Sequence, residues 1–297
     1  MDADDLAVFA AVARTGGITR AARTLNTVQS NVTQRIRLLE AELGVPLFHR
    51  QSRGVTLTSA GEQLLPYAER IGRLIDEAKR AAAGGPVPRG QITIGALETA
   101  TAVRLPPVLS VYAAACPEVD MQIQTGTAAE LTDAVLAYRV EAAFVPGPIH
   151  HPDLVAVRLL EEELVVVTAP WIRSLEDLPR AGRRPLKIIV FRPGCSYRAR
   201  LEALLAGRGL VNIRRLEFGT LDGIIGCAGA GIGLTMPPRA VVARAEAEGR
   251  VALHALAAED ARVEIVLVRR RDAFVSTALA RFIDIALGHL AAPARVT

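Results

Sequence analysis

The segment from Val28 to Leu43 constrains the fold most, because its apolar residues can bury only one face of a helix. Five apolar side chains share that face at helical spacing: Val28, Val32, Ile36, Leu39 and Leu43. The opposite and flanking positions carry Ser30, Asn31, Thr33, Gln34 and Arg37. Uncharged hydrogen-bonding side chains and arginine suit base edges and phosphates in a DNA major groove. An ordinary solvated helix face is the alternative that this pattern by itself leaves open.

Shorter patterns around this segment complete a small domain. A first helix, ended by a glycine pair, is predicted by an apolar stripe at Leu6, Phe9, Ala10 and Ala13. We expect Thr19 to cap a second short helix that ends at Leu25, and Asn26 and Thr27 to cap the third. Residues 49–54 make a basic turn before a short strand at 55–57. This order predicts an all-α winged helix-turn-helix domain over residues 1–57.

The positive charge of the chain is concentrated in this region. The whole chain has a net charge of +4, and residues 14–53 hold seven arginines against two glutamates, a local charge of +5. A basic patch on a nearly neutral body indicates a polyanionic partner for that part. A solvated arginine face is the alternative.

A long helix is predicted from Thr58 to about residue 83, and residues 58–89 are expected to link two domains. Ser59 to Glu62 is a capping-box sequence that begins the helix. The residues that follow step by four and three positions, the repeat of a coiled-coil seam: Leu64, Ala68, Ile71, Ile75 and Ala78. We expect this seam to pair with a second chain, and the alternative is a helix that lies on its own domain.

The remaining residues, 90–297, alternate strand and helix patterns and predict an α/β domain. Strands are expected at 92–96, 119–125, 142–145, 164–168, 187–191, 213–218, 233–236 and 263–268. About 200 residues suffice for two lobes, which we place at about 90–162 with 266–297 and at about 163–265. A chain that crosses twice between lobes makes a hinge with a cleft.

Composition excludes several other classes of protein. Although 51% of the residues are hydrophobic, the longest uncharged stretch, Gly223 to Pro238, is too short to cross a membrane. Three cysteines do not make a disulfide scaffold and fit a reducing compartment. The N-terminus is acidic, unlike a signal peptide. We expect a cytoplasmic protein without a membrane partner.

A set of spaced motifs carries a resemblance to a known family. The set comprises Asp5-Leu6, Thr19-x-Ala21-Ala22, Gln29-Ser30-x-Val32-Thr33, Leu39-Glu40, Leu43-Gly44, Leu47-Phe48-x-Arg50 and Leu57-Thr58-x-Ala60-Gly61. With it, about the first 65 residues resemble the LysR-type transcriptional regulators. The later motifs His151-Pro152-Asp153-Leu154 and Gly229-x-Gly231-Ile232-Gly233 resemble the effector domain of that family, which is similar to type-2 periplasmic solute-binding proteins.

The resemblance and the helix pattern together predict the residues that contact DNA. Gln29, Ser30 and Gln34 are expected to reach bases, and Arg50 and Arg53 to bind phosphates. The predicted set is Thr19, Gln29, Ser30, Asn31, Thr33, Gln34, Arg35, Arg37, Arg50 and Arg53. Gly17 and Asn31 differ from the residues that are common at these positions in the family, and these differences bear on which bases the protein prefers.

An effector site is predicted in the interlobe cleft. Four strand-to-helix turns place hydroxyls and backbone N–H groups at helix N-termini, which favour anions. The predicted residues are Glu98, Thr99, Thr101, Gly126, Thr127, Pro193, Gly194, Cys195, Ser196, Tyr197, Gly219 and Thr220. We expect an anionic metabolite as effector, with no cofactor and no metal, and plain helix capping is the alternative. Cys195 and Cys227 are either a redox pair or small core residues.

The sequence therefore predicts a DNA-binding transcriptional regulator whose activity depends on a small molecule bound between two lobes. The resemblance implies a homodimer or homotetramer and favours the tetramer. No paired carboxylates or catalytic triad can be proposed, so we expect no enzymatic activity. The alternative is a small-molecule binding protein or enzyme with a non-functional N-terminal domain.

Overall fold

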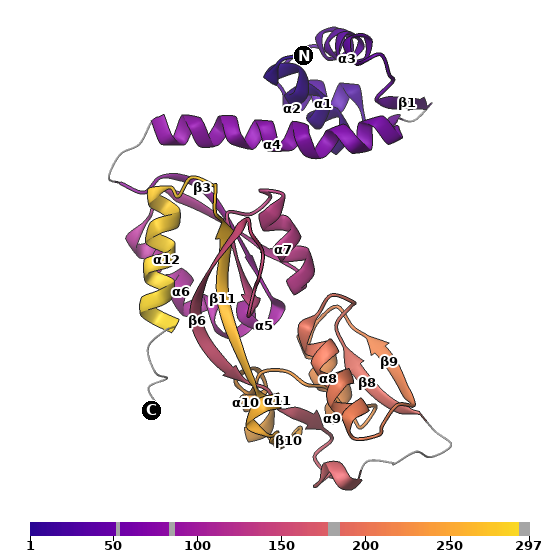
Figure 1. The fold of residues 1–297 in the computed structure, drawn as a ribbon, viewed down its shortest axis with the longest axis vertical. Coiled ribbons are helices and arrows are strands. Elements are labelled where there is room, and N and C mark those ends of the chain that lie inside the picture. The colour runs from indigo at the N-terminus through magenta and orange to yellow at the C-terminus, as the bar shows by residue number, and fades with distance from the viewer. Residues whose placement is uncertain (52–53, 83–86, 178–184, 291–297) are drawn as a thin grey trace. The chain divides into compact units, whose positions relative to one another are not determined.

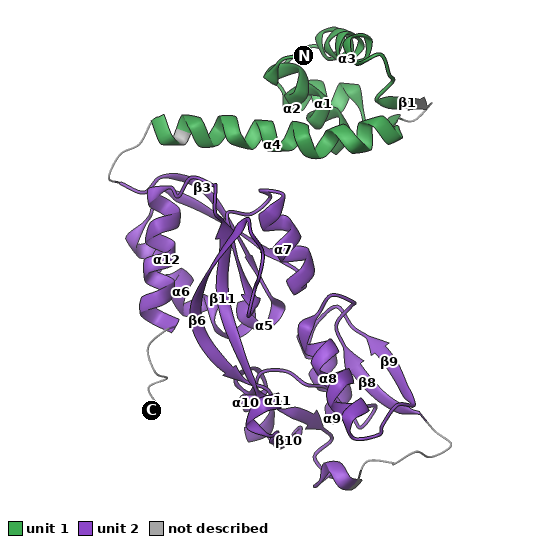
Figure 2. Cartoon of the chain, in the orientation of Figure 1, with its two compact units in different colours: residues 1–84 green, residues 85–297 purple. Residues whose placement is uncertain are grey.

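A computed structural model gives the structure of the chain and describes residues 1–51, 54–82, 87–177 and 185–290. The chain divides into two compact units, Met1–Gly84 and Gly85–Thr297 (Figure 2). The long helix packs with the first unit, whereas the sequence predicted residues 58–89 as a separate segment that links two domains. In the described residues, no helix is long and apolar enough to span a membrane.

The first unit consists of a three-helix head, a hairpin and a long helix (Figure 1). Its elements are α1 (Ala3–Thr15), α2 (Ile18–Thr24), α3 (Gln29–Leu43), β1 (Phe48–Gln51), β2 (Gly54–Leu57) and α4 (Ser59–Ala82). One face of each helix supplies the core, in which Phe9 packs against Phe48 with ring centroids 5.3 Å apart. On α3, Val32, Ile36 and Leu39 are buried, but Val28 and Leu43 are exposed. The predicted winged helix-turn-helix fold is confirmed.

The predicted helix caps were wrong. Helix α2 begins two residues earlier, with Gly17 as its N-cap, and the Thr19 hydroxyl donates to Gln29 Oε1 instead (3.2 Å). Helix α3 has no side-chain cap, because Thr27 Oγ1 accepts from the side chain of Asn31 (3.0 Å). At α4 it is Thr58, not Ser59, whose hydroxyl accepts the backbone N–H of the third helical residue.

Helix α4 lies directly against the rest of its own unit. A Cβ atom at Gly61 would stand 2.3 Å from the Leu47 carbonyl oxygen, so only glycine permits this approach. Further along, Ala68 is 2% exposed, and Leu64 and Ile71 pack partly against the core. The first half of the predicted seam therefore packs on its own domain, which was the alternative interpretation. A neighbouring stripe of α4 faces outward instead: Tyr67, Leu74, Ala78 and Ala81, here called the outer stripe.

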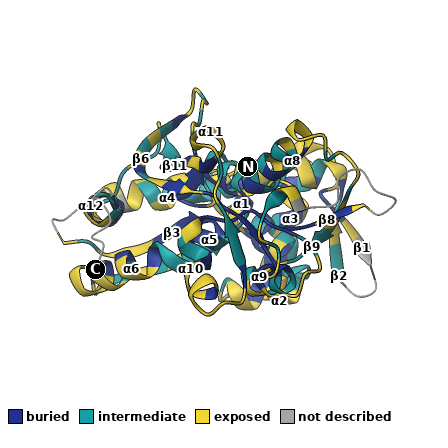
Figure 3. Ribbon diagram, turned by 90° about the horizontal axis from the view of Figure 1, so that it is seen from below, coloured by how far each residue is buried: buried dark blue, intermediate teal, exposed yellow. Residues whose placement is uncertain are grey.

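The first lobe of the second unit is built on a five-stranded mixed sheet. Its strands lie in the order β4 (Val119–Thr125), β3 (Gly90–Ala96), β5 (Ala142–Pro146), β11 (Arg262–Arg270) and β6 (Leu154–Glu163). Strand β3 runs parallel to β4 and β5, and β11 is antiparallel to both its neighbours. Helices α6 (Leu105–Ala115) and α12 (Thr277–Leu290) flank the sheet on one side and α7 (Ala128–Leu136) on the other (Figure 1). Buried residues concentrate on these strands and on inward helix faces (Figure 3).

The second lobe holds two small sheets and short helices. Strand β8 (Leu186–Val190) pairs in parallel with β9 (Ile213–Glu217), and β7 (Val166–Thr168) pairs with β10 (Ala252–His254). The helices are α8 (Ser196–Gly207), α9 (Leu221–Gly229), α10 (Arg239–Ala247) and α11 (Ala258–Ala261). The expected strand at 233–236 was wrong, because Leu234 and Thr235 form only isolated bridges. The chain leaves the first sheet after β6 and returns to it at Arg262, a few residues before the expected position.

Candidate functional site

The outer face of α3 is the exposed polar surface of the first unit. Gln29, Ser30, Asn31, Gln34 and Arg37 are exposed, and Thr33 is half-buried with its hydroxyl bonded to the Gln29 carbonyl oxygen (2.9 Å). The bond from Thr19 to the Gln29 side chain ties the start of α3 to α2. This surface carries hydrogen-bonding groups on a helix whose opposite face is buried.

The structure gives Arg35 a role other than the predicted DNA contact. Its guanidinium donates to Asp5 Oδ1 at 2.9 Å and lies 3.6 Å from Asp2 Oδ1 and 3.8 Å from Asp4 Oδ2. These carboxylates open α1, so Arg35 joins α3 to the N-terminus. The Arg35 guanidinium is therefore engaged by carboxylates of the same unit. Of the wing arginines, Arg50 lies on β1, and Arg53 lies outside the described residues.

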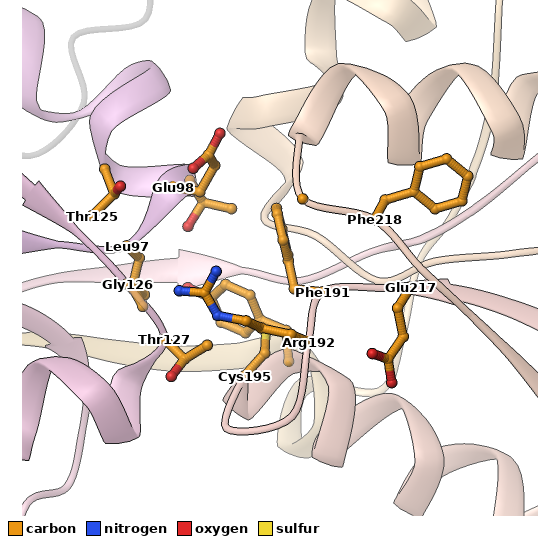
Figure 4. Close-up of a pocket in the computed structure, with 13 residues that line it drawn as sticks. Leu97, Glu98, Thr125, Gly126, Thr127, Phe191, Arg192, Cys195, Glu217 and Phe218 are labelled. Carbon is orange, nitrogen blue, oxygen red and sulfur yellow. The ribbon is translucent and has the colours of Figure 1, made fainter. Parts of the chain in front are cut away.

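In the second unit a cavity of about 320 Å³ is lined by residues of both lobes (Figure 4). The first lobe contributes 97–99, after β3, and 125–127, at the end of β4; the second contributes Phe191, Arg192, Cys195 and Tyr197, after β8, and 217–219, at the end of β9. All four stretches lie at the carboxyl ends of parallel strands, where open α/β sheets bind ligands. The arrangement is a ligand pocket between two lobes.

The pocket brings together only part of the predicted effector set. The lining members are Glu98, Thr99, Gly126, Thr127, Cys195, Tyr197 and Gly219; those outside the lining are Thr101, Pro193, Gly194, Ser196 and Thr220. Thr101 donates to the Glu98 carbonyl oxygen, and Thr220 caps α9. Gly194, at φ +94°, packs so closely that a Cβ atom there would stand 2.8 Å from Thr127 Oγ1. Thr101, Thr220 and Gly194 therefore stabilise the turns around the pocket.

Sequence reasoning missed six lining residues: Leu97, Thr125, Phe191, Arg192, Glu217 and Phe218. Each stands within two residues of the carboxyl end of a parallel strand. The general position of ligands in such sheets was therefore the signal that could have found them.

Charged groups around the pocket are mostly paired. Arg192 donates to both Glu130 oxygens (Nε–Oε1 3.1 Å, Nη2–Oε2 2.7 Å), and Glu217 accepts from Arg198 at 2.7 Å. The Arg192 bond, followed by the Thr127 backbone N–H, lowers the pKa of Glu130 to about 2. Within the described residues, Glu98 has no hydrogen-bond or ion-pair partner for its carboxylate. The pocket thus holds one carboxylate that a ligand can pair.

Cys195 does not have the environment of a reactive thiol. Burial raises the pKa of its thiol, more than the backbone N–H groups of Tyr197 and Arg198 lower it. A raised pKa favours the protonated thiol, and this favours the alternative of a small core residue. In the described residues no group of three or more His, Cys, Asp or Glu side chains is placed to hold a metal ion.

A buried ionic contact lies beside the pocket. Glu162, at the end of β6, is 5% exposed and accepts from Arg104 Nε at 2.9 Å and from the Tyr197 hydroxyl at 3.3 Å. Burial, and next the Glu162 charge, raise the pKa of Tyr197, so its hydroxyl stays protonated and donates. This contact links the first lobe to α8 of the second.

A winged helix-turn-helix unit joined to a two-lobed ligand-pocket unit defines a ligand-responsive DNA-binding regulator. Residues 3–62 match the model of the bacterial regulatory helix-turn-helix proteins of the lysR family, and residues 86–291 match the LysR substrate binding domain. The chain therefore belongs to the LysR family of DNA-binding transcriptional regulators, as its sequence motifs predicted. Regulators of this family bind DNA and small-molecule effectors and form oligomers.

Individual relatives agree with this assignment. The chain is 43% identical over 281 residues to the HTH-type transcriptional regulator GltR of Bacillus subtilis, covering 94% of this chain and 93% of GltR. It is 44% identical over 284 residues to the uncharacterized regulator YusT of the same organism, covering 96% and 95%. Full-length CbnR in complex with its target DNA has a similar fold, with a TM-score of 0.67 at 24% identity over 96% of this chain and 99% of CbnR. ArgP of Mycobacterium tuberculosis also has a similar fold, with a TM-score of 0.69 at 22% identity over 98% of this chain and 97% of ArgP.

Proposed function

We propose that the chain recognises a specific DNA sequence through the outer face of α3 and that a small molecule in the pocket controls this activity. The observation that carries the DNA-binding part is the set Ser30, Gln34 and Arg37. These side chains are exposed and, within the described part of the chain, form no hydrogen bond or ion pair. Ser30 and Gln34 have the groups to read base edges, and Arg37 to contact phosphate.

The effector we propose is a small anionic metabolite. The pocket is lined by Thr99 and Thr127, at the starts of α5 (Glu98–Val103) and α7, and by Arg192, which supplies a guanidinium. Such groups stabilise a carboxylate, and the cavity volume suits a small metabolite. Because its relatives are transcriptional regulators, we propose a regulator without catalytic activity that acts on DNA in the cytoplasm.

We also propose that two chains associate through the outer stripe of α4. Tyr67 is 65% exposed and Leu74 is 43% exposed, although both are large apolar residues on an ordered helix. The stripe keeps the seven-residue spacing of a coiled-coil seam, with Ile71 at its edge. A second copy of α4 is the partner that matches this spacing.

The experiment that tests the proposed function is a gel-shift assay with the DNA upstream of the protein's own gene and a scrambled fragment of equal length. We expect a band with the native fragment at protein concentrations that leave the scrambled fragment free. Equal binding to both fragments contradicts sequence-specific recognition.

Arg37→Ala is expected to weaken binding to all DNA sequences to a similar extent, because a phosphate contact carries no base information. The slope of log affinity against log salt should fall by about one unit. The matched control is Arg35→Ala on the same helix, which should leave the slope unchanged because Arg35 is held by Asp5. If the slope falls for Arg35→Ala but not for Arg37→Ala, then Arg35 contacts phosphate and Arg37 does not.

A further inference from the structure

Arg192 reaches from the second lobe to the first. It follows β8, and its side chain points across the pocket toward Gly126 and Thr127 (Figure 4). Its Nε and Nη2 atoms lie 3.1 and 2.7 Å from the two carboxylate oxygens of Glu130, on α7. This is the two-point geometry with which arginine binds any carboxylate. The arginine of the pocket is therefore occupied by a carboxylate of the protein itself.

Glu130 is held in place independently of Arg192. The Thr127 backbone N–H donates to Glu130 Oε2 at 2.8 Å, and the Glu130 N–H donates to Thr127 Oγ1 at 3.3 Å. These two bonds form a capping box at the start of α7. If Arg192 moves away, Glu130 keeps a donor for its charge, so the helix start does not lose its cap.

The ion pair itself costs little to break. The Arg192 side chain is 58% exposed and the Glu130 side chain 49% exposed, and pairs at this exposure contribute little to stability. A ligand carboxylate in the pocket would offer Arg192 the same two acceptors in a less exposed place. Exchange of one carboxylate for the other is therefore feasible without a large change in the protein.

Glu98 restricts which charged groups the ligand can carry. It lines the same pocket, and its charge acts on Arg192. With Glu98 and Glu130 both negative near Arg192, a second anionic group on the ligand would be repelled. An ammonium or another hydrogen-bond donor would instead pair with Glu98.

We propose that Glu130 is a built-in competitor of the effector: an effector with one carboxylate, and a donor group beside Glu98, binds by taking Arg192 from Glu130. This inference rests on the proposed effector function of the pocket. Because Arg192 and Glu130 belong to different lobes, the exchange removes a direct ion pair between the lobes. Effector binding is thereby coupled to the freedom of the two lobes to move.

The test uses the full-length protein and the variant Glu130→Gln. Glutamine at this position preserves the capping box but cannot form the ion pair. The probe is sodium acetate against sodium chloride at equal ionic strength, followed by the rise in melting temperature. We expect acetate to stabilise the wild-type protein more than chloride does, and Glu130→Gln to respond at an acetate concentration about three- to tenfold lower.

Two further variants complete the design. Arg192→Ala should abolish the difference between acetate and chloride. Glu248→Gln, which removes an exposed carboxylate that is paired with Arg244 and Arg250 and is not part of the pocket lining, should behave as the wild type. Replacing acetate with glycine should increase the rise in melting temperature, because the ammonium of glycine pairs with Glu98. Glu98→Gln should remove this increase.

Separate outcomes contradict the two claims. An acetate response that is equal in the wild type and Glu130→Gln, or absent from both, overturns competition by Glu130. A wild-type protein that fails to prefer its native DNA fragment contradicts the proposed function, whatever the acetate response. Acetate binding that survives Arg192→Ala overturns the role of Arg192.

Discussion

Replacing Arg104 with methionine is expected to lower the free energy of unfolding of the second unit by about 3 kcal/mol. Glu162, its partner at 2.9 Å, is 5% exposed, whereas the Arg104 side chain is 28% exposed. Without Arg104 the Glu162 carboxylate keeps, among the described residues, only the Tyr197 hydroxyl, 3.3 Å away, and at 5% exposure it has little access to water. Methionine retains most of the aliphatic volume, so the loss reports the unpaired buried charge and not a cavity.

Urea unfolding followed by tryptophan fluorescence is a suitable measurement, because the single tryptophan, Trp171, belongs to the second unit. Over a unit of this size, the expected fall in melting temperature is about 6–12 °C. The double variant Arg104→Met/Glu162→Gln should recover most of the loss, because it removes the charge as well as its partner. Arg244→Met, which breaks an exposed pair with Glu248, should cost about 0–1 kcal/mol. Equal losses for the buried and the exposed pair would contradict the role of burial.

The buried contact also explains why the pocket keeps its shape. Arg104 is the C-cap of α5, Glu162 is the second-last residue of β6, and Tyr197 lies in the first turn of α8 and lines the pocket. Three elements from both sides of the interlobe crossing therefore meet at one carboxylate. Because this wall of the pocket is fixed, the contact of the more exposed Arg192 can change when a ligand binds while the wall keeps its structure.

The architecture of the first unit was predictable because each helix has one buried face and apolar spacing reveals it. The N-caps of α2, α3 and α4 were not, because several threonines, serines and asparagines stand near these helix starts and all are suitable acceptors. Which one is used depends on contacts from elsewhere: Thr19 bonds to Gln29, and Thr27 is engaged by Asn31. Such choices are made by tertiary packing and leave no mark in the local pattern.

The ten-residue strand β6 was missed for a related reason. Its second half ends in three consecutive glutamates, and charged residues are depleted in strands. In the structure its partner β11 supplies opposite charges: Arg262 lies 3.5 Å from Glu161, and Arg158 lies 3.2 Å from Glu264. Cross-strand pairs of this kind stabilise a sheet, but they join residues about 100 positions apart. One-dimensional periodicity cannot detect them.

The candidate pocket shows the same limit. Helix-start residues such as Thr127 were identified because hydroxyls and turns are visible in the sequence. Arg192 was not, because its only local signal is its position just after a strand, and its partner Glu130 lies 62 positions away in the sequence. Its importance arises only when Glu130 and the pocket lie beside it.

The first half of the predicted seam packs on its own unit because one helix can carry two apolar stripes with the same spacing. Leu64 and Ala68 belong to the stripe that packs on the first unit, and Tyr67 and Leu74 to the outer stripe. Sequence spacing alone does not say which stripe a domain will cover. Only the exposure of the second stripe leaves it available to another chain.

Leu74→Glu is therefore expected to convert the protein to monomers and to lower operator affinity about 100-fold or more, because two linked heads bind a two-part site far more tightly than one. Glutamate is a good helix former, so α4 should persist, while a charge in a paired apolar seam opposes association. Light scattering measures the mass, and gel shift measures the affinity. Lys79→Glu, an exposed charge change on α4 outside the outer stripe, is the matched control and should remain dimeric. A Leu74→Glu protein that keeps the wild-type mass would show that chains associate through a different surface.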